Sequence, residues 1–315
     1  MAGLEFEKPI VDLEKKIQEL KNFVSEKKIN LSAEVSRLED KLEHLKKETY
    51  NNLTAWQKVQ IARHPQRPYT LDYISMLMSD FVELRGDRAF ADDKALVTGL
   101  ATLERQRVAV IGHQKGRDTK ENLKRNFGCA HPEGYRKALR IMRLAEQFDL
   151  PVLLFIDTPG AYPGIGAEER GQSQAIAENL REMISIAVPM VATVIGEGGS
   201  GGALGIGVVD RVCVLENAYY SVISPEGCAA ILWKDGAKAP EAAEVLKLTS
   251  QDLLKTGIID EIIPEPSGGA HRDPQRMAQN LKDALLRNLG ELKKLDKEEL
   301  LKLRYKKFRG IGAFA

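Results

Sequence analysis

The chain has 315 residues, of which 43% are hydrophobic, so it can bury a sizeable core and is not expected to be mainly disordered. Its 46 Lys and Arg residues against 45 Asp and Glu residues give a net charge of +1, which excludes a global electrostatic attraction to DNA or to membranes. With only 6% aromatic residues, the composition also argues against a base-stacking surface for single-stranded nucleic acid.

Targeting and redox signals point to the cytoplasm. No uncharged apolar run approaches the roughly 20 residues that a membrane helix needs. Glu5 and Glu7 stand where a signal peptide would be basic and then apolar. The three cysteines, Cys129, Cys213 and Cys228, are far apart and form no C-x-x-C pair. We therefore expect a cytoplasmic protein with no membrane span, no disulfide framework and no metal of its own.

Residues 1–50 are rich in charge, and their apolar residues recur three and four positions apart. The two series are Ile10, Leu13, Ile17, Leu20 and Val24, and then Leu31, Val35, Leu38, Leu42 and Leu45. Each series is an a/d seam two heptads long, and Lys27-Lys28-Ile29-Asn30 interrupts the register between them. The pattern predicts a coiled-coil-like helical hairpin. Its apolar stripe packs either on the body of its own chain or against another subunit, and the sequence favours neither.

The following segment, 51–94, is expected to be a connector with a helical part, and His64-Pro65-Gln66-Arg67-Pro68 makes part of it rigid. From residue 95 to 268, short apolar strands alternate with helices, which predicts an α/β core with covered parallel strands. We expect strands at Leu96–Leu103, Arg107–Ile111, Val152–Ile156, Val191–Ile195 and Val212–Leu215, and helices after Pro132, at Ala175–Ile186, at Ala203–Val209 and from Ser224-Pro225. Residues 269–315 are expected to form C-terminal helices that begin at Asp273-Pro274 and at Asp296.

Two glycine-rich loops each follow a buried strand, at Asp157–Gly166 and Gly196–Gly202. In an open α/β sheet, ligands bind beyond the carboxyl ends of the strands. Glycine lets the main chain approach a ligand closely, and the first turn of a helix offers unpaired N–H groups to a negative atom. Five glycines in the seven positions of the second loop exceed what a tight turn requires.

Three familiar motifs fit these loops poorly. Asp157-Thr-Pro-Gly160 resembles a GTPase switch, but Gly112–Thr119 lacks the spacing and the Gly-Lys pair of a phosphate loop. Gly196-x-Gly198-x-x-Gly201 matches the dinucleotide fingerprint, but the next strand follows too closely for the usual crossover helix. Ser200 lacks the nucleophile elbow of a serine hydrolase. What remains is a site rich in main-chain donors, which suits a reaction that must hold an anion on oxygen, such as an enolate or a ureido anion.

Longer runs of residues are more specific. They are Asp157–Gly164 with Ala167–Gln172, Gly196–Leu204, Ser221–Cys228, His64–Asp72, Gly112–Gly116 and Glu261–Pro266. Together they resemble the carboxyltransferase alpha subunit of multi-subunit, bacterial-type acetyl-CoA carboxylase, and the resemblance extends from about Phe6 to Arg309.

The resemblance implies a crotonase-like (ClpP/crotonase) fold of stacked ββα units. It also implies an active site shared with a zinc-containing beta subunit, in an alpha2beta2 heterotetramer. It implies transfer of the carboxyl group from carboxybiotin to acetyl-CoA, which gives malonyl-CoA for fatty-acid biosynthesis. The biotin is covalently attached to a separate biotin carboxyl carrier protein, and only a separate biotin carboxylase uses ATP.

The resemblance also assigns residues. Gly201 and Gly202 correspond to the glycine pair that holds the biotin oxygen, and the beta subunit holds the thioester oxygen. We expect the substrate-binding residues to be Gly160, Gly164, Gly166, Arg170, Gly198 and Gly199. Arg170 can equally be a solvated helix arginine.

Two other classes of function remain open at this stage. A stand-alone crotonase-like hydratase or isomerase needs a pair of catalytic carboxylates, for which Glu168, Glu169 and Glu197 are the candidates. A scaffold or nucleic-acid regulator would use the basic stretch Lys115–Arg125, although such a run is more often a solvated face. His113 is expected to be a satisfied structural histidine, and Cys129 with His131 are too few to bind a metal.

Overall fold

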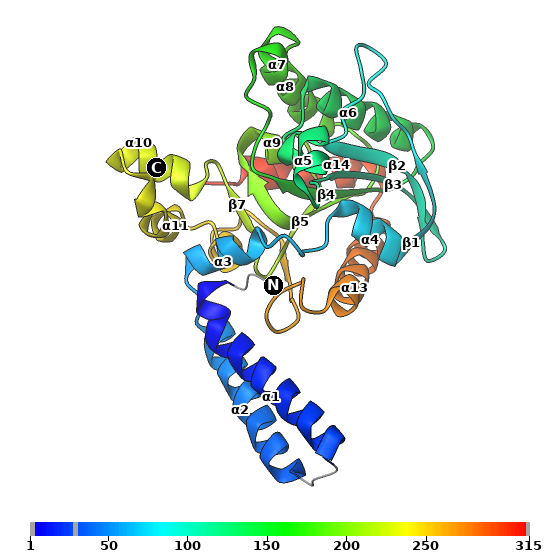
Figure 1. Ribbon diagram of the computed structural model, residues 1–315. Helices are drawn as coiled ribbons and strands as arrows, with labels where there is room; N and C mark the ends of the chain where they lie inside the picture. The colour runs from blue at the N-terminus through cyan, green and yellow to red at the C-terminus, as the bar shows by residue number, and fades with distance from the viewer. Residues whose placement is uncertain (1–3, 28–30, 313–315) are drawn as a thin grey trace.

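The computed structural model describes residues 4–27 and 31–312, with the side chains of residues 25–27 left out. It shows an α/β body built on one mixed sheet, from which a pair of long helices projects (Figure 1). Among the described residues, no helix combines the length and the apolar character that crossing a membrane would require.

The sheet has the strand order β1-β2-β3-β4-β5-β6-β8, with the short β7 paired to the end of β5. The strands are β1 Met78–Glu83, β2 Leu96–Leu103, β3 Gln106–His113, β4 Val152–Thr158, β5 Met190–Gly199, β6 Arg211–Leu215, β7 Tyr219–Ser221 and β8 Glu261–Ile263. β1, β2 and β3 are antiparallel, whereas every pairing from β3 to β8 is parallel. Every residue of β4 and β5 is buried, as expected for parallel strands covered on both faces.

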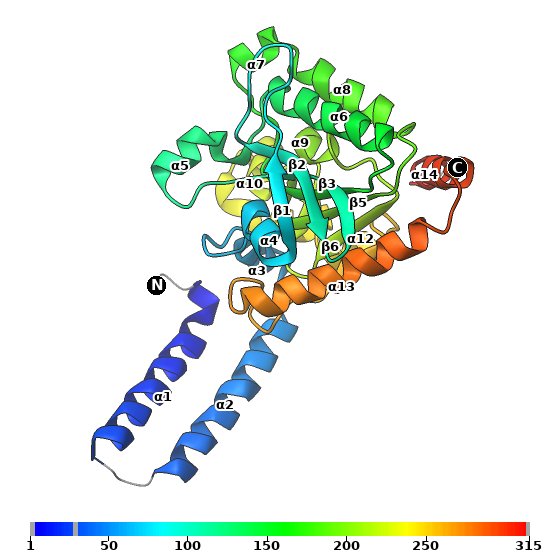
Figure 2. The same cartoon turned by 90° about the vertical axis from the view of Figure 1, so that its right-hand side faces the viewer.

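Helices cover the two faces of the sheet. α6 (Pro132–Gln147) and α8 (Gln172–Met183) pack against each other on one face, and α13 (Pro274–Leu292) runs along the other (Figure 2). The predicted stripe of α6, which includes Tyr135 and Met142, is buried against the sheet. The remaining elements are α3 Ala55–Ala62, α4 Thr70–Leu77, α5 Thr119–Lys124, α7 Ile165–Glu169, α9 Ser200–Leu204, α10 Pro225–Trp233, α11 Ala239–Leu246, α12 Ser250–Lys255 and α14 Lys297–Arg309, with 3-10 turns η1 Glu5–Glu7, η2 Asn126–Gly128 and η3 Gly236–Lys238.

The predicted hairpin consists of α1 (Lys8–Lys27) and α2 (Ser32–Asn51), and the expected break at Lys28–Asn30 lies outside the described residues. Ile10, Ile17 and Leu42 are buried between the two helices. The apolar stripe of each helix is thus covered by the other helix of the hairpin. Near its base the hairpin bonds to the body, where Arg272 lies 3.5 Å from Glu7 and 3.3 Å from Glu14.

Three predicted helix starts are confirmed by their caps. The side chains of Ser224, Asp273 and Asp296 accept hydrogen bonds from the main-chain N–H groups of Gly227, Arg276 and Glu299. Each cap satisfies one of the N–H groups that the first turn of a helix leaves without a partner.

Several predicted boundaries were wrong. β5 does not end at Ile195 but continues to Gly199, so Gly196–Gly199 are strand residues. The following helix is Ser200–Leu204 and not Ala203–Val209, and α8 covers Gln172–Met183 instead of Ala175–Ile186. Because the glycines carry no side chains, the expected apolar pattern of a buried strand stops although the strand does not.

The segment predicted to be a helical connector also holds a strand. β1 pairs with β2 with a register irregularity between Ser79 and Val82, and it forms one edge of the sheet. The irregularity interrupts the alternation of apolar and polar residues by which a strand is recognised. The division of the chain into four segments, drawn from the sequence, stays a prediction.

Candidate active site

The two glycine-rich segments meet at the carboxyl ends of β4 and β5. Thr158 and Gly198 are partners in the parallel pairing of the two strands. A Cβ atom on Gly199 would lie 2.2 Å from the Pro159 carbonyl oxygen, and one on Gly202 would lie 2.5 Å from the Gly160 carbonyl carbon. This close approach of two main-chain segments requires glycine at Gly199 and Gly202. It brings together Gly160, Gly198, Gly199 and Gly202.

Gly201 and Gly202 belong to the first turn of α9, which begins directly at the end of β5. Ser200, the first residue of α9, has a φ of +51°, a left-handed conformation that turns the chain sharply. The N–H groups in the first turn of a helix have no carbonyl partner one turn earlier and carry a partial positive charge. The arrangement can therefore hold a negatively charged oxygen beside Gly201, where a Cβ atom would have only Ile176 Cδ1 within 4 Å, at 3.8 Å.

The other predicted binding residues lie on α7. Gly164 is its N-cap, Gly166 is within it and Arg170 follows it. The guanidinium of Arg170 is 2.5 Å from Glu133 Oε1 and lies over the ring of Phe90 at 4.8 Å. Its charge is thus balanced by a partner in its own chain, and a role for Gly164, Gly166 and Arg170 in binding stays a prediction.

A buried charged cluster behind the glycine segments was not predicted. The Lys115 Nζ atom is 2.7 Å from Asp157 Oδ1 and 2.6 Å from Glu197 Oε2. Asp157 is in β4, Glu197 is in β5, and Lys115 follows β3. The sequence carried a signal, since Asp157 is the first residue and Glu197 the second residue of a glycine-rich segment, but it does not reveal that a lysine of the basic stretch reaches both.

The second oxygen of Glu197 is also occupied. Oε1 accepts hydrogen bonds from the Tyr219 hydroxyl at 2.7 Å and from Arg63 Nε at 2.7 Å, and Arg63 in turn is 2.5 Å from Glu226. Burial by itself would raise the pKa of Glu197, but the positive charges of Lys115 and Arg63 outweigh it and lower this pKa to about 2. Glu197 is therefore a permanently ionised structural carboxylate and a poor proton acceptor.

Glu197 is therefore excluded as the catalytic carboxylate of a hydratase, although it was the best placed of the three candidates. Glu168 and Glu169, the other two candidates, are exposed on α7. Catalytic carboxylates of that kind act from a site where burial raises their pKa. Glu197 is buried but its pKa is lowered, and Glu168 and Glu169 are not buried, so none of the three fits that role.

The basic stretch does not form one exposed face. The side chain of Lys115 is only 12% exposed, and Arg117 donates to the Pro65 carbonyl at 2.7 Å and forms an ion pair with Asp72. Arg125 is paired with Glu121 at 3.1 Å, and only Lys120 and Lys124 of the stretch extend freely into solvent in the described structure. A regulator that binds nucleic acid through this stretch would lack the required positive surface.

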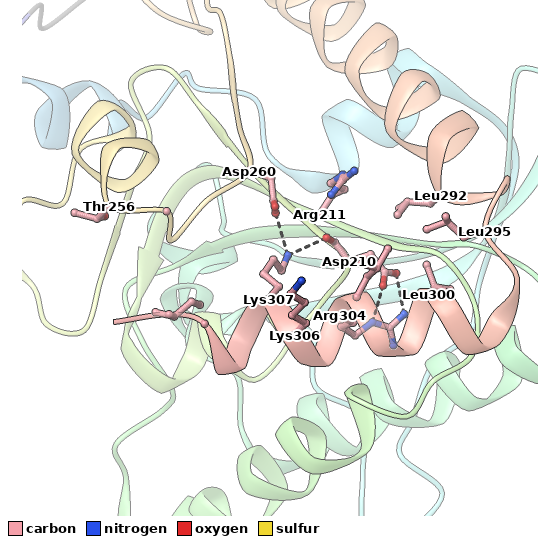
Figure 3. Close-up of a pocket in the computed structure, with 14 residues that line it drawn as sticks. Asp210, Arg211, Thr256, Asp260, Leu292, Leu295, Leu300, Arg304, Lys306 and Lys307 are labelled. Atoms are coloured by element: carbon pink, nitrogen blue, oxygen red, sulfur yellow. Dashed lines mark hydrogen bonds and ion pairs between the residues drawn. The ribbon is translucent and has the colours of Figure 1, made fainter. Parts of the chain in front are cut away.

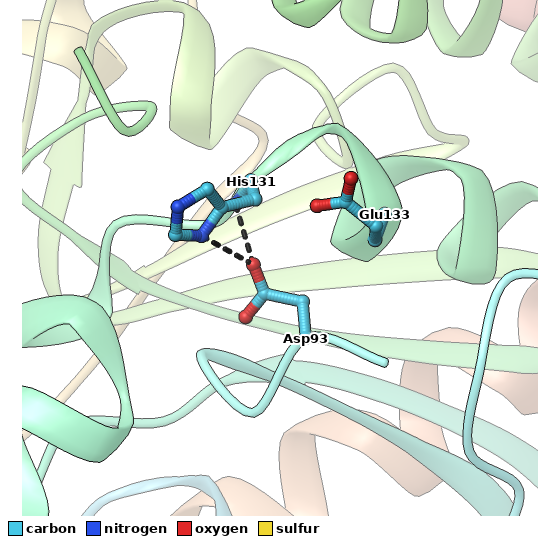
Figure 4. A group of neighbouring side chains, drawn as sticks. All are labelled: Asp93, His131 and Glu133. Atoms are coloured by element: carbon cyan, nitrogen blue, oxygen red, sulfur yellow. Dashed lines mark hydrogen bonds and ion pairs between the residues drawn. The ribbon is translucent and has the colours of Figure 1, made fainter. Parts of the chain in front are cut away.

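His131 lies beside two carboxylates, Asp93 and Glu133, a grouping that the sequence did not suggest (Figure 4). In the described part of the chain this is the one group of His, Cys and acidic residues close enough for a metal. However, Asp93 accepts the main-chain N–H groups of His131 and Ala95, at 2.5 and 2.6 Å, and Glu133 is bound by Arg170. These oxygens are already used within the protein, so we interpret the group as structural.

His113 is structural, as predicted, but it is not satisfied. It is fully buried, and neither ring nitrogen has a hydrogen-bond partner among the described residues. Burial and the nearby Lys115 lower its pKa to about 3, although the main chain of Phe155 weakly favours the charged form. A fully buried histidine with so low a pKa is a weak proton acceptor, so His113 is not a base for the reaction.

A pocket of about 510 Å³ lies at the opposite end of the sheet, between α14 and the start of β6 (Figure 3). Arg304 and Lys307 face it, but Arg304 is paired with Asp210 at 2.8 Å and Lys307 with Asp260 at 2.9 Å. Since Asp210 bonds to Met190 at the first residue of β5, this pocket is remote from the glycine segments at the last residues of that strand.

Comparison with known proteins agrees with this geometry. A family model described as acetyl co-enzyme A carboxylase carboxyltransferase-like matches residues 3–312. The acetyl-coenzyme A carboxylase carboxyl transferase subunit alpha of Thermus thermophilus is 60% identical over 312 residues, which cover 99% of each chain. The subunit of the same name from Geobacter metallireducens is 58% identical over 99% of this chain and 98% of that one.

Solved structures share the fold at low identity. The chain superposes on transcarboxylase 12S with a TM-score of 0.55 and 20% identity, over 71% of this chain and 44% of that one, so it spans less than half of that protein. A chain of a Pseudomonas malonate decarboxylase hetero-tetramer gives a TM-score of 0.53 and 18% identity, over 68% of this chain and 85% of that one. These likenesses confirm the expected crotonase-like α/β fold.

Proposed function

The chain belongs to the family of acetyl-coenzyme A carboxylase carboxyl transferase alpha subunits, and on this premise we propose how its residues serve the reaction. It is a subunit of a carboxyltransferase that converts acetyl-CoA to malonyl-CoA for fatty-acid biosynthesis. We propose that the carboxyl donor is biotin carried covalently by a biotin carboxyl carrier protein, which a separate ATP-using biotin carboxylase loads. The biotin ring supplies a carrier for the activated carboxyl group.

The main-chain N–H groups of Gly201 and Gly202 are assigned to the biotin oxygen. Two observations support a fit: both residues lie in the first turn of α9, and the space beside Gly201 is open where a Cβ atom would point. As the carboxyl group leaves, negative charge develops on the biotin oxygen, and fixed donors stabilise that charge without reorganising. One such donor contributes roughly 10²–10³ in rate, about 2.7–4 kcal/mol.

The neighbouring glycines shape the space around these donors. Gly199 and Gly202 lie in direct main-chain contact with Pro159 and Gly160, and Gly198 lies against the main chain of Tyr219 in β7, which leaves no room for side chains at these contacts. Gly164, Gly166 and Arg170 on and after α7 are proposed to border the substrate. Water must be kept from this space, because a released carboxyl group that escapes as CO2 is lost to the reaction.

The reaction also produces a negative oxygen on the thioester, and we assign its donors to a second chain, a zinc-containing beta subunit. The apolar face of α10 supports such a partner. Ile231, Leu232 and Trp233 are 71%, 63% and 38% exposed, and Val222, which directly follows β7, is 77% exposed. β7 pairs with the end of β5, so this face adjoins the glycine segments.

The sequence of α10 is apolar on nearly all sides, which is typical of a helix that is buried all round. Within the described structure, the buried residues of α10 are Pro225, Cys228 and Ala229, of which the last two pack against Ala242 of α11. We propose that the beta subunit covers the rest, that the assembly is an alpha2beta2 heterotetramer in the cytoplasm, and that this chain itself binds no metal.

The deciding experiment is reconstitution. The purified chain is mixed with a beta subunit, biotin and malonyl-CoA, and the reverse transfer of the carboxyl group to biotin is measured. We expect activity only when both chains are present. A chain that alone hydrates an enoyl-CoA, and gains nothing from the beta subunit or biotin, would instead establish the hydratase alternative.

A further inference from the structure

Lys115 connects the two segments that carry the glycines. Its Nζ atom bridges Asp157, three residues before Gly160, and Glu197, directly before Gly198. We propose that Lys115 is a positioning residue, which fixes the spacing of the two glycine segments and thereby the direction of the donors in α9. The structural part of this inference is independent of the proposed function, and only its kinetic consequence rests on it.

The geometry around Lys115 leaves little freedom. Asp157 Oδ1 accepts both the Lys115 ammonium at 2.7 Å and the Glu197 main-chain N–H at 2.9 Å. A Cβ atom on Gly196 would lie 2.5 Å from the same Oδ1, so this residue is a glycine to admit the carboxylate. On the other side, a Cβ atom on Gly128 would come within 2.8 Å of Lys115 Cγ. Lys115 is thus enclosed by the chain segments that carry Asp157, Gly196 with Glu197, and Gly128.

The three side chains of the bridge have little contact with solvent, which makes each dependent on its partners. The side chains of Lys115, Asp157 and Glu197 are 12%, 3% and 8% exposed, so water cannot replace a lost partner. Burial alone would lower the pKa of Lys115, but the two carboxylates outweigh it and raise this pKa well above the ordinary value. Removing one partner of such a group leaves buried charge uncompensated, which is strongly unfavourable.

The surroundings of the cluster define its charge balance. Besides the two carboxylates, ionisable groups on the surrounding segments face the cluster. They are Arg63 directly after α3, Arg67 and Tyr69 before α4, Tyr73 in α4, His113 at the end of β3, Cys129 after η2 and Tyr219 on β7, with Glu226 on α10 bound to Arg63. Burial raises the pKa of the Cys129 thiol to about 11 and lowers that of His113 to about 3. Both are therefore neutral between pH 6 and 8, and Lys115 is the cation that reaches both strand ends.

Without Lys115, the carboxylates of Asp157 and Glu197 would face each other behind a site that must stabilise an anion. Two like charges in one buried place cannot both stay ionised easily, so one of them would take up a proton at a raised pKa. Their repulsion would push the ends of β4 and β5 apart. A displacement of about 1 Å at the donors is enough to cost about 10²-fold in rate.

The first test compares two lysine variants of the full chain assembled with its beta subunit. Lys115→Met removes the bridge. Lys307→Met is the matched control, because Lys307 is also a largely buried lysine, 2.9 Å from Asp260, but lies at the other end of the sheet. We expect Lys115→Met to lower kcat about 10²-fold with KM changed less than about threefold. We expect Lys307→Met to keep the kcat of the wild type.

Amide hydrogen exchange provides a readout that needs no catalytic activity. In Lys115→Met, segments 157–164 and 196–204 should exchange faster than in the wild type, and Lys307→Met should leave both unchanged. If the wild type itself shows no carboxyl transfer, the proposed function fails, and the exchange result still decides whether Lys115 positions the segments.

A charge-balanced double variant separates positioning from mere destabilisation. Asp157→Asn in the Lys115→Met background removes one carboxylate, and the asparagine Oδ1 can still accept the Glu197 N–H. We expect the double variant to recover at least about tenfold in kcat. In the single variant, activity should rise as the pH falls through the raised pKa of the carboxylate pair, and in the double variant this rise should be absent.

Three results would overturn the proposal. The first is unchanged exchange of both segments in Lys115→Met. The second is unchanged kcat in that variant when the wild type is active. The third is a loss of activity that matches the loss in melting temperature, shows no pH dependence and is not relieved by Asp157→Asn.

Discussion

Gly201 and Gly202 are neighbours in α9, but the space around their Cα atoms differs. A side chain on Gly201 would enter open space, whereas one on Gly202 would strike the main chain of Gly160 at 2.5 Å. Crowding of the bound oxygen and displacement of the first glycine segment are therefore separable effects. The sequence alone treats the two positions as equivalent.

We accordingly predict that Gly201→Val lowers carboxyl transfer about 10²-fold while the chain melts within a few degrees of the wild type. Gly202→Val should lose transfer and also stability. Gly99→Val in β2 should lose mainly stability, because its Cβ would lie 2.4 Å from the Val82 carbonyl oxygen, away from the site. Reverse-transfer kinetics and thermal unfolding of the assembled proteins test this. Full activity of assembled Gly201→Val and Gly202→Val would remove the oxyanion assignment.

His113 gives a residue-scale prediction about pH. Its folded-state pKa of about 3 is below the ordinary value of 6.5, so between these pH values the unfolded chain binds a proton that the folded chain does not. This histidine therefore lowers stability as the pH falls below 6.5, by up to about 1.4 kcal/mol per pH unit.

Replacing the ring by an apolar side chain, His113→Leu, should remove that contribution, so its free energy of unfolding should fall less steeply from pH 6.5 to pH 4. Urea unfolding at several pH values measures the slope, and His44→Leu on the exposed surface of the hairpin serves as the control. Equal slopes for wild type and His113→Leu would contradict the assignment.

At the scale of elements, the sequence was informative where a pattern is local. The stripe of α6 and the caps of α10, α13 and α14 depend on residues a few positions apart, and all were found from the sequence. The end of β5 was missed because its glycines hide the apolar pattern, and β1 because a register irregularity breaks it. The Lys115 cluster was missed for a different reason: its members are 42 and 82 positions apart.

The exposed face of α10 leads to a prediction about assembly. Changing Ile231 and Leu232 together to Glu should weaken binding of the beta subunit at least tenfold, because two charges would have to be buried in an apolar contact. Since both residues are exposed, the isolated chain should unfold as the wild type does. The matched control is Phe148→Glu, which changes a residue of similar exposure, 63%, at the end of α6.

Sedimentation or titration calorimetry with the beta subunit measures this effect. Unchanged affinity of the double variant would show that the partner binds elsewhere. A comparable loss in Phe148→Glu would show that added negative charge, and not this face, is responsible.

At the scale of the whole molecule, the body is closed at the end of the sheet that lies opposite the glycine segments. Arg304 of α14 is 1% exposed, and its guanidinium binds Asp210 at 2.8 Å with two of its nitrogens. It also donates to the carbonyls of Met183, Ile186 and Val188, at 2.8, 2.6 and 3.0 Å. One side chain thereby joins the C-terminal helix to the end of α8, to the approach to β5 and to the start of β6.

From these contacts we predict that a change at Arg304 lowers the stability of the chain without lowering its catalytic rate. Arg304→Leu would leave Asp210 buried without its cation and three carbonyls without donors, so it should lower the free energy of unfolding by about 3–5 kcal/mol. The glycine segments lie at the other end of β5, so the variant that remains folded should keep the kcat of the wild type. Urea unfolding and transfer assays at low temperature measure the two quantities. A loss of kcat without a loss of stability would mean that the two ends of the sheet are coupled, because no direct contact joins Arg304 to the site among the residues described.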